Sequence, residues 1–507
     1  MSPLITYAAL LAVSQVGGKA AVDPITGEKR TGTPAPAASA SPAAAPAPPA
    51  AKADPKLFEQ ALQSYFAQDP RNAAGKLYRF IEGSPSTDEN YAWAQLFLGK
   101  SLIELGLHHA GAVYLAQVAR ERSNPAVLPR ALEALLKLTD APHDEVMIDE
   151  QVFGVLDMAF LPPETSGFAH YYQGLLDLRV GSERWATAHF AKLPEESPEA
   201  SRAKFAVLVT RLKGAKEVPP GIADDFLKLS QDPKLSQQTR NEAMLAVARL
   251  RYEAKDFAGA LEAYGQVKLP SLDPFRATLY LEEAWTRYKL GQVHAAMGIL
   301  TTLDAPLFRD EFLPDKYLLR ASVYRDLCHY LPAKRAAKEL TRRFADSLES
   351  VREREDLTQD LRLRRAAASH GPTQRAQRFL EALNLEGERL GRFAGSFGNR
   401  LFGHLTKVYE LQVGEAKRVY KARLEEAVRQ EADKLLRAAE QVRLMEYEVG
   451  LKLYERIKLG SRLVAAPEEE ALGPEQVAFR FNGEYWNDEL RDYRFNLKSR
   501  CIEETAR

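Results

Sequence analysis

Apolar and small residues recur in the same order in three consecutive blocks between about residues 241 and 344. Within each block, two runs with apolar positions three and four residues apart are separated by a short polar break. This pattern predicts two amphipathic helices joined by a tight turn. Equivalent positions are offset by 36 and then 37 residues, as measured between Ala248, Ala284 and Ala321. The blocks therefore predict three equivalent helix pairs that bury one another's apolar faces.

A weaker form of the pattern extends upstream to about residue 57. Gly99 and Gly111 take the two positions at which paired helices would cross closely, and another block carries Gly174 and Ala186 in the pattern. Five or six blocks fit it, with irregular helix pairs between them. We therefore expect one continuous helical array over residues 56–346.

Long, charged helices are expected over residues 347–460. Between residues 424 and 449, apolar positions alternate at three- and four-residue spacing, with one break at Glu431. This spacing is typical of a coiled-coil-like seam. The run covers only about four heptads, so packing against neighbouring helices of the same chain and dimerisation both remain open.

The first 55 residues differ in composition from the rest. Residues 4–16 form a short apolar run followed by small residues, which predicts a signal-peptide-like leader over residues 1–21. No Lys or Arg precedes the run, so a disordered apolar leader is the alternative. Residues 22–55 are mostly Ala, Pro and Ser and predict a disordered, extended linker.

Charge, hydropathy and cysteine content argue against several classes of protein. Lys plus Arg and Asp plus Glu both number 69, and this balance argues against a nucleic-acid-binding protein. No apolar run approaches the ~18 residues of a membrane-spanning helix. The two cysteines, Cys328 and Cys501, are too few for a disulfide framework. An exported chain would permit a bridge, but burial as a small apolar side chain is the favoured role for Cys328.

No catalytic constellation stands out. The sequence has no phosphate-binding glycine loop, no metal-type cysteine spacing and no nucleophile elbow. His108 and His109 lie near Glu104 at a predicted exposed turn, but they offer too few ligands for a metal site. We therefore expect a protein that is not an enzyme, with no metal, no cofactor and no small-molecule substrate.

The helix pairs resemble the tetratricopeptide (TPR) repeat, most clearly from Ala248 to Tyr264, with Asp256-Phe257 at the turn and Ala260 at the crossing. The resemblance implies an all-α fold: a right-handed TPR-like helical solenoid followed by long, coiled-coil-like C-terminal helices. It also implies that the first helix of each repeat lines a concave, protein-binding face. On this chain that face would consist of Leu245, Arg249, Tyr252, Trp285, Tyr288, Lys289, Ser322 and Arg325. For Tyr252 and Tyr288, packing between repeats is the alternative.

Residues 461–507 form an aromatic-rich tail. Its candidate contact residues are Phe481, Tyr485, Trp486 and Tyr493, which are separated by charged residues. One interpretation is a latch that packs on the helix at residues 424–453, because aromatic side chains bury large areas. The other is a docking motif for a partner. The latch is favoured because the charged residues between the aromatics suit a solvent-facing side.

The whole layout, including the tail motif FNGEYWNDEL at residues 481–490, is similar to TPR proteins of myxobacterial cell envelopes. Among these, it most resembles the periplasmic TPR component of the adventurous gliding-motility apparatus. The resemblance implies export to the periplasm or cell envelope and a scaffold role among other envelope-complex proteins. A TPR assembly factor for outer-membrane or secretion machinery, or a cytoplasmic TPR regulator, is the alternative.

Overall fold

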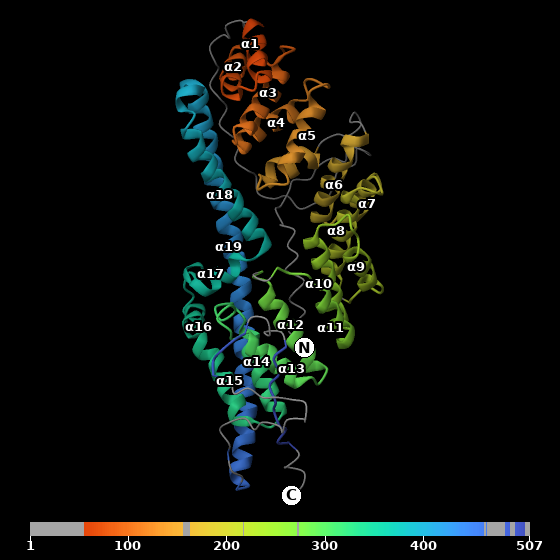
Figure 1. Ribbon diagram of the computed structural model, residues 1–507, viewed down its shortest axis with the longest axis vertical. Coiled ribbons are helices and arrows are strands. Elements are labelled where there is room, and N and C mark those ends of the chain that lie inside the picture. Colours follow the sequence, from red (N-terminus) through yellow and green to blue (C-terminus); the bar gives the residue numbers. More distant parts are fainter. Residues whose placement is uncertain are drawn as a thin grey trace. The chain divides into compact units, whose positions relative to one another are not determined.

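The structure is a computed structural model that describes residues 55–155, 163–215, 217–270, 273–460, 463, 482–486 and 492–501 (Figure 1). The expected leader, the expected linker up to residue 54, and Phe481 lie outside the described residues. Over the described ranges the regular structure is helical throughout, without strands. The all-α class expected from the sequence is therefore confirmed.

The chain divides into two compact units, each assembled from separated stretches of sequence. The N-terminal unit comprises the described residues up to 214 together with 374–423. The C-terminal unit comprises 215–373 and the described residues from 424 onward. The helices after residue 346 therefore belong to the same units as the helix pairs before it, and the longest helix, α19 (Ala394–Lys458), contributes to both.

The N-terminal unit begins with a series of helices in which most consecutive neighbours pack together. A π-helical turn at Val146–Val152 and a 3-10 turn at Phe153–Val155 follow the fifth helix. The helices are α1 (Pro55–Phe66), α2 (Pro70–Gly83), α3 (Tyr91–Glu104), α4 (His108–Glu121), α5 (Leu128–Leu138), α6 (Pro163–Arg179), α7 (Glu183–Phe190) and α8 (Pro198–Gly214).

The closest approach of α3 to α4 depends on two glycines. A Cβ on Gly111 would lie 2.6 Å from the carbonyl oxygen of Gly99, and a Cβ on Gly99 would lie 3.0 Å from that of Gly111. Both distances are shorter than an ordinary van der Waals contact, so a larger residue at either position would push the helices apart. These are the two positions at which the sequence predicted a close crossing.

Most of α18 (Gly371–Gly391) and the first half of α19 cover α1–α4 in this unit. Their buried side chains form one apolar cluster with those of α1–α4. The members from α18 and α19 include Leu383, Leu390, Phe397, Leu401 and Leu405, and those from α2 and α3 include Leu77, Leu98 and Leu102.

Buried polar contacts fix α18 and α19 in place. The Glu386 carboxylate accepts the backbone N–H of His109 at 2.9 Å and the hydroxyl of Tyr409 at 2.6 Å. Burial raises the pKa of Glu386, although these hydrogen bonds oppose it. His109, which the sequence suggested would be exposed at a turn, is buried beside the rings of Phe379 and Tyr409.

The C-terminal unit contains the three blocks of the sequence pattern as three helix pairs, α10/α11, α12/α13 and α14/α15. They are preceded by α9, and α16, a 3-10 turn at Leu357–Gln359 and α17 follow them. The bounds are α9 (Ile222–Ser230), α10 (Gln237–Glu253), α11 (Phe257–Gln266), α12 (Arg276–Lys289), α13 (Val293–Thr302), α14 (Pro314–Asp326), α15 (Tyr330–Arg343), α16 (Ala345–Arg352) and α17 (Leu361–Ala368).

The turn inside each of these pairs has the same backbone geometry. One residue per turn adopts a positive φ: 65° at Lys255, 76° at Gly291 and 60° at Cys328. This left-handed conformation favours glycine, yet only the middle turn has one. The three positions are offset by 36 and then 37 residues, so the sequence period is also the period of the structure.

The second half of α19 packs along α14 and α15 (Figure 1). The coiled-coil-like seam expected between residues 424 and 449 is therefore an intramolecular one in its second half. Its side chains are Leu435, Ala438, Val442, Met445, Val449 and Leu453, against Tyr317, Leu318, Ala321, Ala333, Ala337 and Leu340.

Glu431, the break in the apolar pattern of the seam, is buried and has charged partners. Its Oε1 accepts hydrogen bonds from His370 Nε2 and from Lys434 Nζ, each at 2.6 Å. Burial acts to raise the pKa of Glu431, but the hydrogen bonds and the Lys434 charge outweigh it and hold the pKa below the ordinary value. The polar residue thus anchors the segment that precedes α18.

None of the described helices is both long enough and apolar enough to span a lipid bilayer.

Candidate functional site

Residues 492–501, here called the tail segment, run without helix over α13, α14 and α15 of the C-terminal unit. The backbone N–H of Phe495 donates to the carbonyl of His294 at 3.0 Å, and that of Arg500 donates to the carbonyl of Leu327 at 3.1 Å. The helix pairs therefore accept main-chain hydrogen bonds from the tail segment at the start of α13 and at the end of α14.

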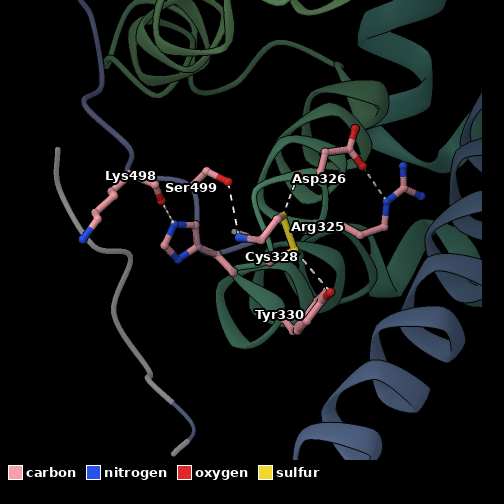
Figure 2. The surroundings of a disulfide bond; sticks show 8 residues. Arg325, Asp326, Cys328, Tyr330, Lys498 and Ser499 are labelled. Carbon is pink, nitrogen blue, oxygen red and sulfur yellow. Dashed lines mark hydrogen bonds and ion pairs between the residues drawn. A yellow bond between two sulfur atoms is a disulfide. The ribbon is translucent and has the colours of Figure 1, made fainter. Parts of the chain in front are cut away.

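Two histidine side chains of the helix pairs bind carbonyl groups of the tail segment. His294 Nε2 lies 3.1 Å from the carbonyl oxygen of Leu497. His329 Nε2 lies 2.7 Å from that of Lys498, a contact drawn in Figure 2. A carbonyl oxygen only accepts, so each imidazole carries its proton on Nε2 and donates. Main-chain groups of the tail segment thus act as both donors and acceptors.

The position of His329 explains how it becomes available for this contact. It is the N-cap residue of α15, at the place in its repeat that Asp256 takes in the first. The Asp256 carboxylate accepts the N–H of Gly259 at 2.9 Å and caps α11. His329 makes no such cap. At this position the third helix pair therefore has a side chain that binds the tail segment, where the first has a side chain that caps a helix.

Apolar side chains of the tail segment complete the contact. Leu497 is only 2% exposed and belongs to the same apolar cluster as residues of α12, α13 and α14. Tyr493 and Phe495 are half-buried against that cluster, as is Tyr485, which precedes the tail segment. The tail segment thus combines backbone hydrogen bonds with a buried apolar anchor, as in the recognition of a non-helical peptide.

The surface of α13 is shaped to admit this backbone. A Cβ on Gly298 would lie 1.6 Å from the carbonyl oxygen of Tyr493. No side chain fits in that space, so the tail segment reaches α13 only because residue 298 is glycine.

A disulfide joins the end of the tail segment to the repeats. Cys501 is bonded to Cys328, which lies in the turn between α14 and α15, and the two Cα atoms are 5.3 Å apart (Figure 2). The Tyr330 hydroxyl donates to Cys328 Sγ at 3.4 Å. Cys328 is buried, as the sequence suggested. The sequence left its pairing open, and the structure assigns it to Cys501.

The aromatic candidates of the tail behave differently from one another. Tyr485 and Tyr493 pack on the repeats, whereas Trp486 is exposed and its backbone N–H donates to the Tyr493 hydroxyl at 2.9 Å. Phe481 is not among the described residues. The latch was expected to pack on the helix at residues 424–453. Instead Tyr485 and Tyr493 lie against α12–α14, and of the tail residues that the structure describes, Leu463 and Cys501 join the α19 seam.

Four of the eight residues expected on a concave face take part in packing between helices. Leu245, Tyr252 and Ser322 are buried. Arg249 forms a two-pronged ion pair with Glu282, with distances of 3.0 and 2.8 Å, which links α10 to α12. These four residues therefore stabilise the packing between helices.

Of the other four residues, Tyr288 and Arg325 contact Asp326, and Trp285 and Lys289 contact the Tyr288 ring. The Tyr288 hydroxyl donates to the Asp326 carboxylate, as does Arg325 Nε at 2.9 Å. Burial, together with the Asp326 carboxylate, raises the pKa of Tyr288. The ring of Trp285 meets that of Tyr288 edge-on at 5.9 Å, and Lys289 is exposed, with its Nζ 5.5 Å from the Tyr288 ring centroid.

This group is not open to a partner on all sides, because the chain itself covers part of it. Arg325 Nη1 reaches the Glu448 carboxylate of α19 at 3.2 Å. Trp285 is half-buried and packs against both the α12–α14 cluster and the α19 seam. The most complete contact surface on these repeats is therefore the one under the tail segment.

The residues that form this surface were not identified from the sequence. The sequence pattern places His294 and His329 near ordinary turns between helices and gives no reason to single out Gly298. One signal was available: His329 occupies the cap position that Asp256 takes in the first repeat. Within the described residues, no three His, Cys, Asp or Glu side chains are grouped so that they could hold a metal ion.

Comparison of the sequence with models of protein families and with curated proteins gave no match.

Proposed function

We propose that this protein is a non-enzymatic scaffold whose C-terminal repeats bind a non-helical peptide segment of another protein. The observation that carries the proposal is that residues 492–501 of the chain lie on α13–α15 through main-chain hydrogen bonds and a buried leucine. Main-chain hydrogen bonds supply affinity for any peptide of suitable shape, and the apolar contacts select its sequence. The tail segment is then an intramolecular ligand that a partner would replace once the Cys328–Cys501 bond is open.

The repeats themselves belong, in this proposal, to a right-handed TPR-like solenoid. Three helix pairs with offsets of 36 and 37 residues, and a left-handed residue at the same place in each turn, support this assignment. Helical repeat proteins of this kind bind peptides and proteins on extended surfaces.

The compartment we propose is the periplasm or cell envelope. Disulfides persist in oxidising compartments and are rare in the cytosol of most organisms. The Cys328–Cys501 bridge therefore supports export and disfavours a cytoplasmic regulator. Together with the layout of the sequence, it supports a role as a scaffold for other envelope-complex proteins, such as those of a gliding-motility apparatus.

The proposal can be tested with a labelled peptide of residues 492–500 (DYRFNLKSR). In the full chain carrying Cys328→Ser and Cys501→Ser, the tail segment is free to dissociate, and we expect the peptide to bind, as measured by fluorescence anisotropy. Adding Gly298→Ala should abolish binding because its Cβ would occupy the position of the peptide backbone. Gly265→Ala is the matched control, since a Cβ there meets no other atoms.

Circular dichroism should show the same helix content in all these variants. The proposed function is wrong if the peptide fails to bind the correctly folded double-serine chain, or if it binds the Gly298→Ala and Gly265→Ala variants equally well.

A further inference from the structure

The last part of α19 carries a second apolar stripe, on its solvent side. Leu444, Tyr447, Leu451 and Tyr454 follow one another at spacings of three, four and three residues, and each is between 46% and 68% exposed. Of the fifteen large apolar side chains exposed among the described residues, six lie between Leu444 and Leu459. They form a contiguous patch, unlike the single exposed apolar residues that occur on most protein surfaces.

The stripe lies nearly opposite the seam that α19 uses within the chain. Leu444 follows the buried Val442 by two residues, and Leu451 follows the buried Val449 by two. Two residues correspond to a rotation of about 200° around an α-helix. The end of α19 therefore has heptad spacing on two faces: α14 and α15 fill the inner face, and the outer face is open to solvent.

We propose that the outer face binds the same face of a second copy of this chain, as a parallel two-stranded coiled coil. Leu444 and Leu451 would occupy the a positions, and Tyr447 and Tyr454 the d positions. In a parallel pair of this register, each residue of the stripe meets its own counterpart. The pairing does not depend on the function proposed above.

The charges beside the stripe favour this occupant and this direction. Arg443 occupies the g position and Glu448 the next e position, five residues later, and both are exposed. In a parallel pair, g of one helix faces that e of the other, so two Arg443–Glu448 pairs form by symmetry. An antiparallel pair would instead bring e positions together, and these are Glu448 and Glu455. Glu448 also pairs with Arg325, but its side chain remains 60% exposed.

The stripe is short, so the dimer should be a weak one. Two heptads bury no more than the ~800 Å² per partner of a standard interface. We expect an equilibrium between monomer and dimer that shifts with protein concentration.

Sedimentation velocity of the full chain over a wide range of concentrations tests this. The sedimentation coefficient of the wild-type chain should rise to that of a dimer. Leu451→Glu should weaken the dimer by at least about 30-fold, because it places two carboxylates in the apolar seam. The matched control is Leu411→Glu, on the same helix and 77% exposed but outside the stripe; it should leave the dimer unchanged.

Charge exchange tests the direction. Arg443→Glu and Glu448→Arg should each weaken the dimer, and the double variant should restore it. Arg325→Gln controls for the intramolecular pair that Glu448→Arg also removes. A wild-type chain that stays monomeric at every concentration overturns the proposal. So does a dimer that survives Leu451→Glu, or one that the double charge exchange fails to restore.

Discussion

The two units cover their helix pairs by different means. Among the described residues of the N-terminal unit, the segments that pack over the helix pairs are helical: most of α18 and the first half of α19. In the C-terminal unit it consists of the second half of α19 and the tail segment, which has no helix of its own. A helix satisfies its backbone groups internally, whereas a non-helical segment must find partners for them on the surface it covers.

This difference determines what each contact requires. The helical cover depends on apolar side chains with regular spacing, and many combinations of such residues would serve. The tail segment depends on single residues at fixed places: two imidazoles, a glycine that leaves room for a carbonyl, and a cysteine in a turn. The helical contact should therefore lose stability gradually on substitution, and the tail contact should be lost by single changes.

The largest effect is expected from breaking the disulfide. Because Cys328 and Cys501 are 173 residues apart in sequence, the chain-entropy account predicts a loss of up to about 5 kcal/mol when the whole loop unfolds. Hydrogen exchange of α14 and α15 should accelerate in the Cys328→Ser variant. A reductant should reproduce this in the wild-type chain and change nothing in the variant. Unaltered exchange in the reduced wild-type chain would show that the tail segment is held without the bond.

A second test applies the same substitution to both parts of α19. Leu405 and Leu435 are both fully buried, one in each unit. Replacing either with Ala should destabilise its own unit by about 3 kcal/mol, through lost burial and the cavity that remains. Hydrogen exchange should increase in α2–α4 for Leu405→Ala and in α14–α15 for Leu435→Ala. If each substitution increases hydrogen exchange equally in both units, the two halves of α19 do not stabilise their units independently.

A third test concerns the polar residue in the seam. His370→Ala removes one hydrogen bond from the buried Glu431 carboxylate, and we expect a loss of about 1–3 kcal/mol at neutral pH. The pKa of Glu431 is lowered in the folded state. The stabilisation is therefore complete above the unfolded value, near 4.5, and is lost as the pH falls through the folded value.

The difference in unfolding free energy between the wild-type chain and His370→Ala should accordingly shrink in acid. Chemical denaturation at a series of pH values measures it. Glu431→Gln is the control, because it removes the carboxylate whose protonation weakens the contact, and His370→Ala should cost less at neutral pH in that background than in the wild-type chain. A difference that grows in acid would contradict this account.

The smallest effects are expected from the two histidines that hold the tail segment. Replacing His294 or His329 with Leu removes one hydrogen bond to a tail carbonyl, worth about 1 kcal/mol. His329→Gln keeps a side-chain N–H donor and should have less effect than His329→Leu. The readout is amide exchange of Phe495 and Arg500, whose N–H groups bond to the repeats. Equal exchange in the Leu and Gln variants would mean that the imidazole contributes only by packing.

The helical elements could be predicted from the sequence because their determinants are local. Apolar spacing identified the three helix pairs, and Gly99 and Gly111 marked a crossing that the structure confirms. The seam on α19 was also recognised. The partner of the seam was not predicted, because the spacing of Leu435 and Val442 would be the same whether α15 or a helix of another chain packed against it.

The tail surface could not be predicted, since its contacts join residues about 200 positions apart. His294 bonds to Leu497 across 203 residues, and His329 bonds to Lys498 across 169. A histidine in a turn, a glycine within a helix and a lone cysteine are each common on their own. They form a binding surface only where the fold brings them together, and a local sequence pattern does not show which residues the fold brings together.

The Cys328–Cys501 bond also determines what a protease can do to this chain. It closes a covalent ring that contains α15, α16, α17, α18 and α19. A single cut anywhere between the two cysteines opens the ring but leaves the two pieces joined through sulfur. Such a nicked molecule would migrate as an intact chain until it is reduced. Its helices could remain packed, because no fragment is released.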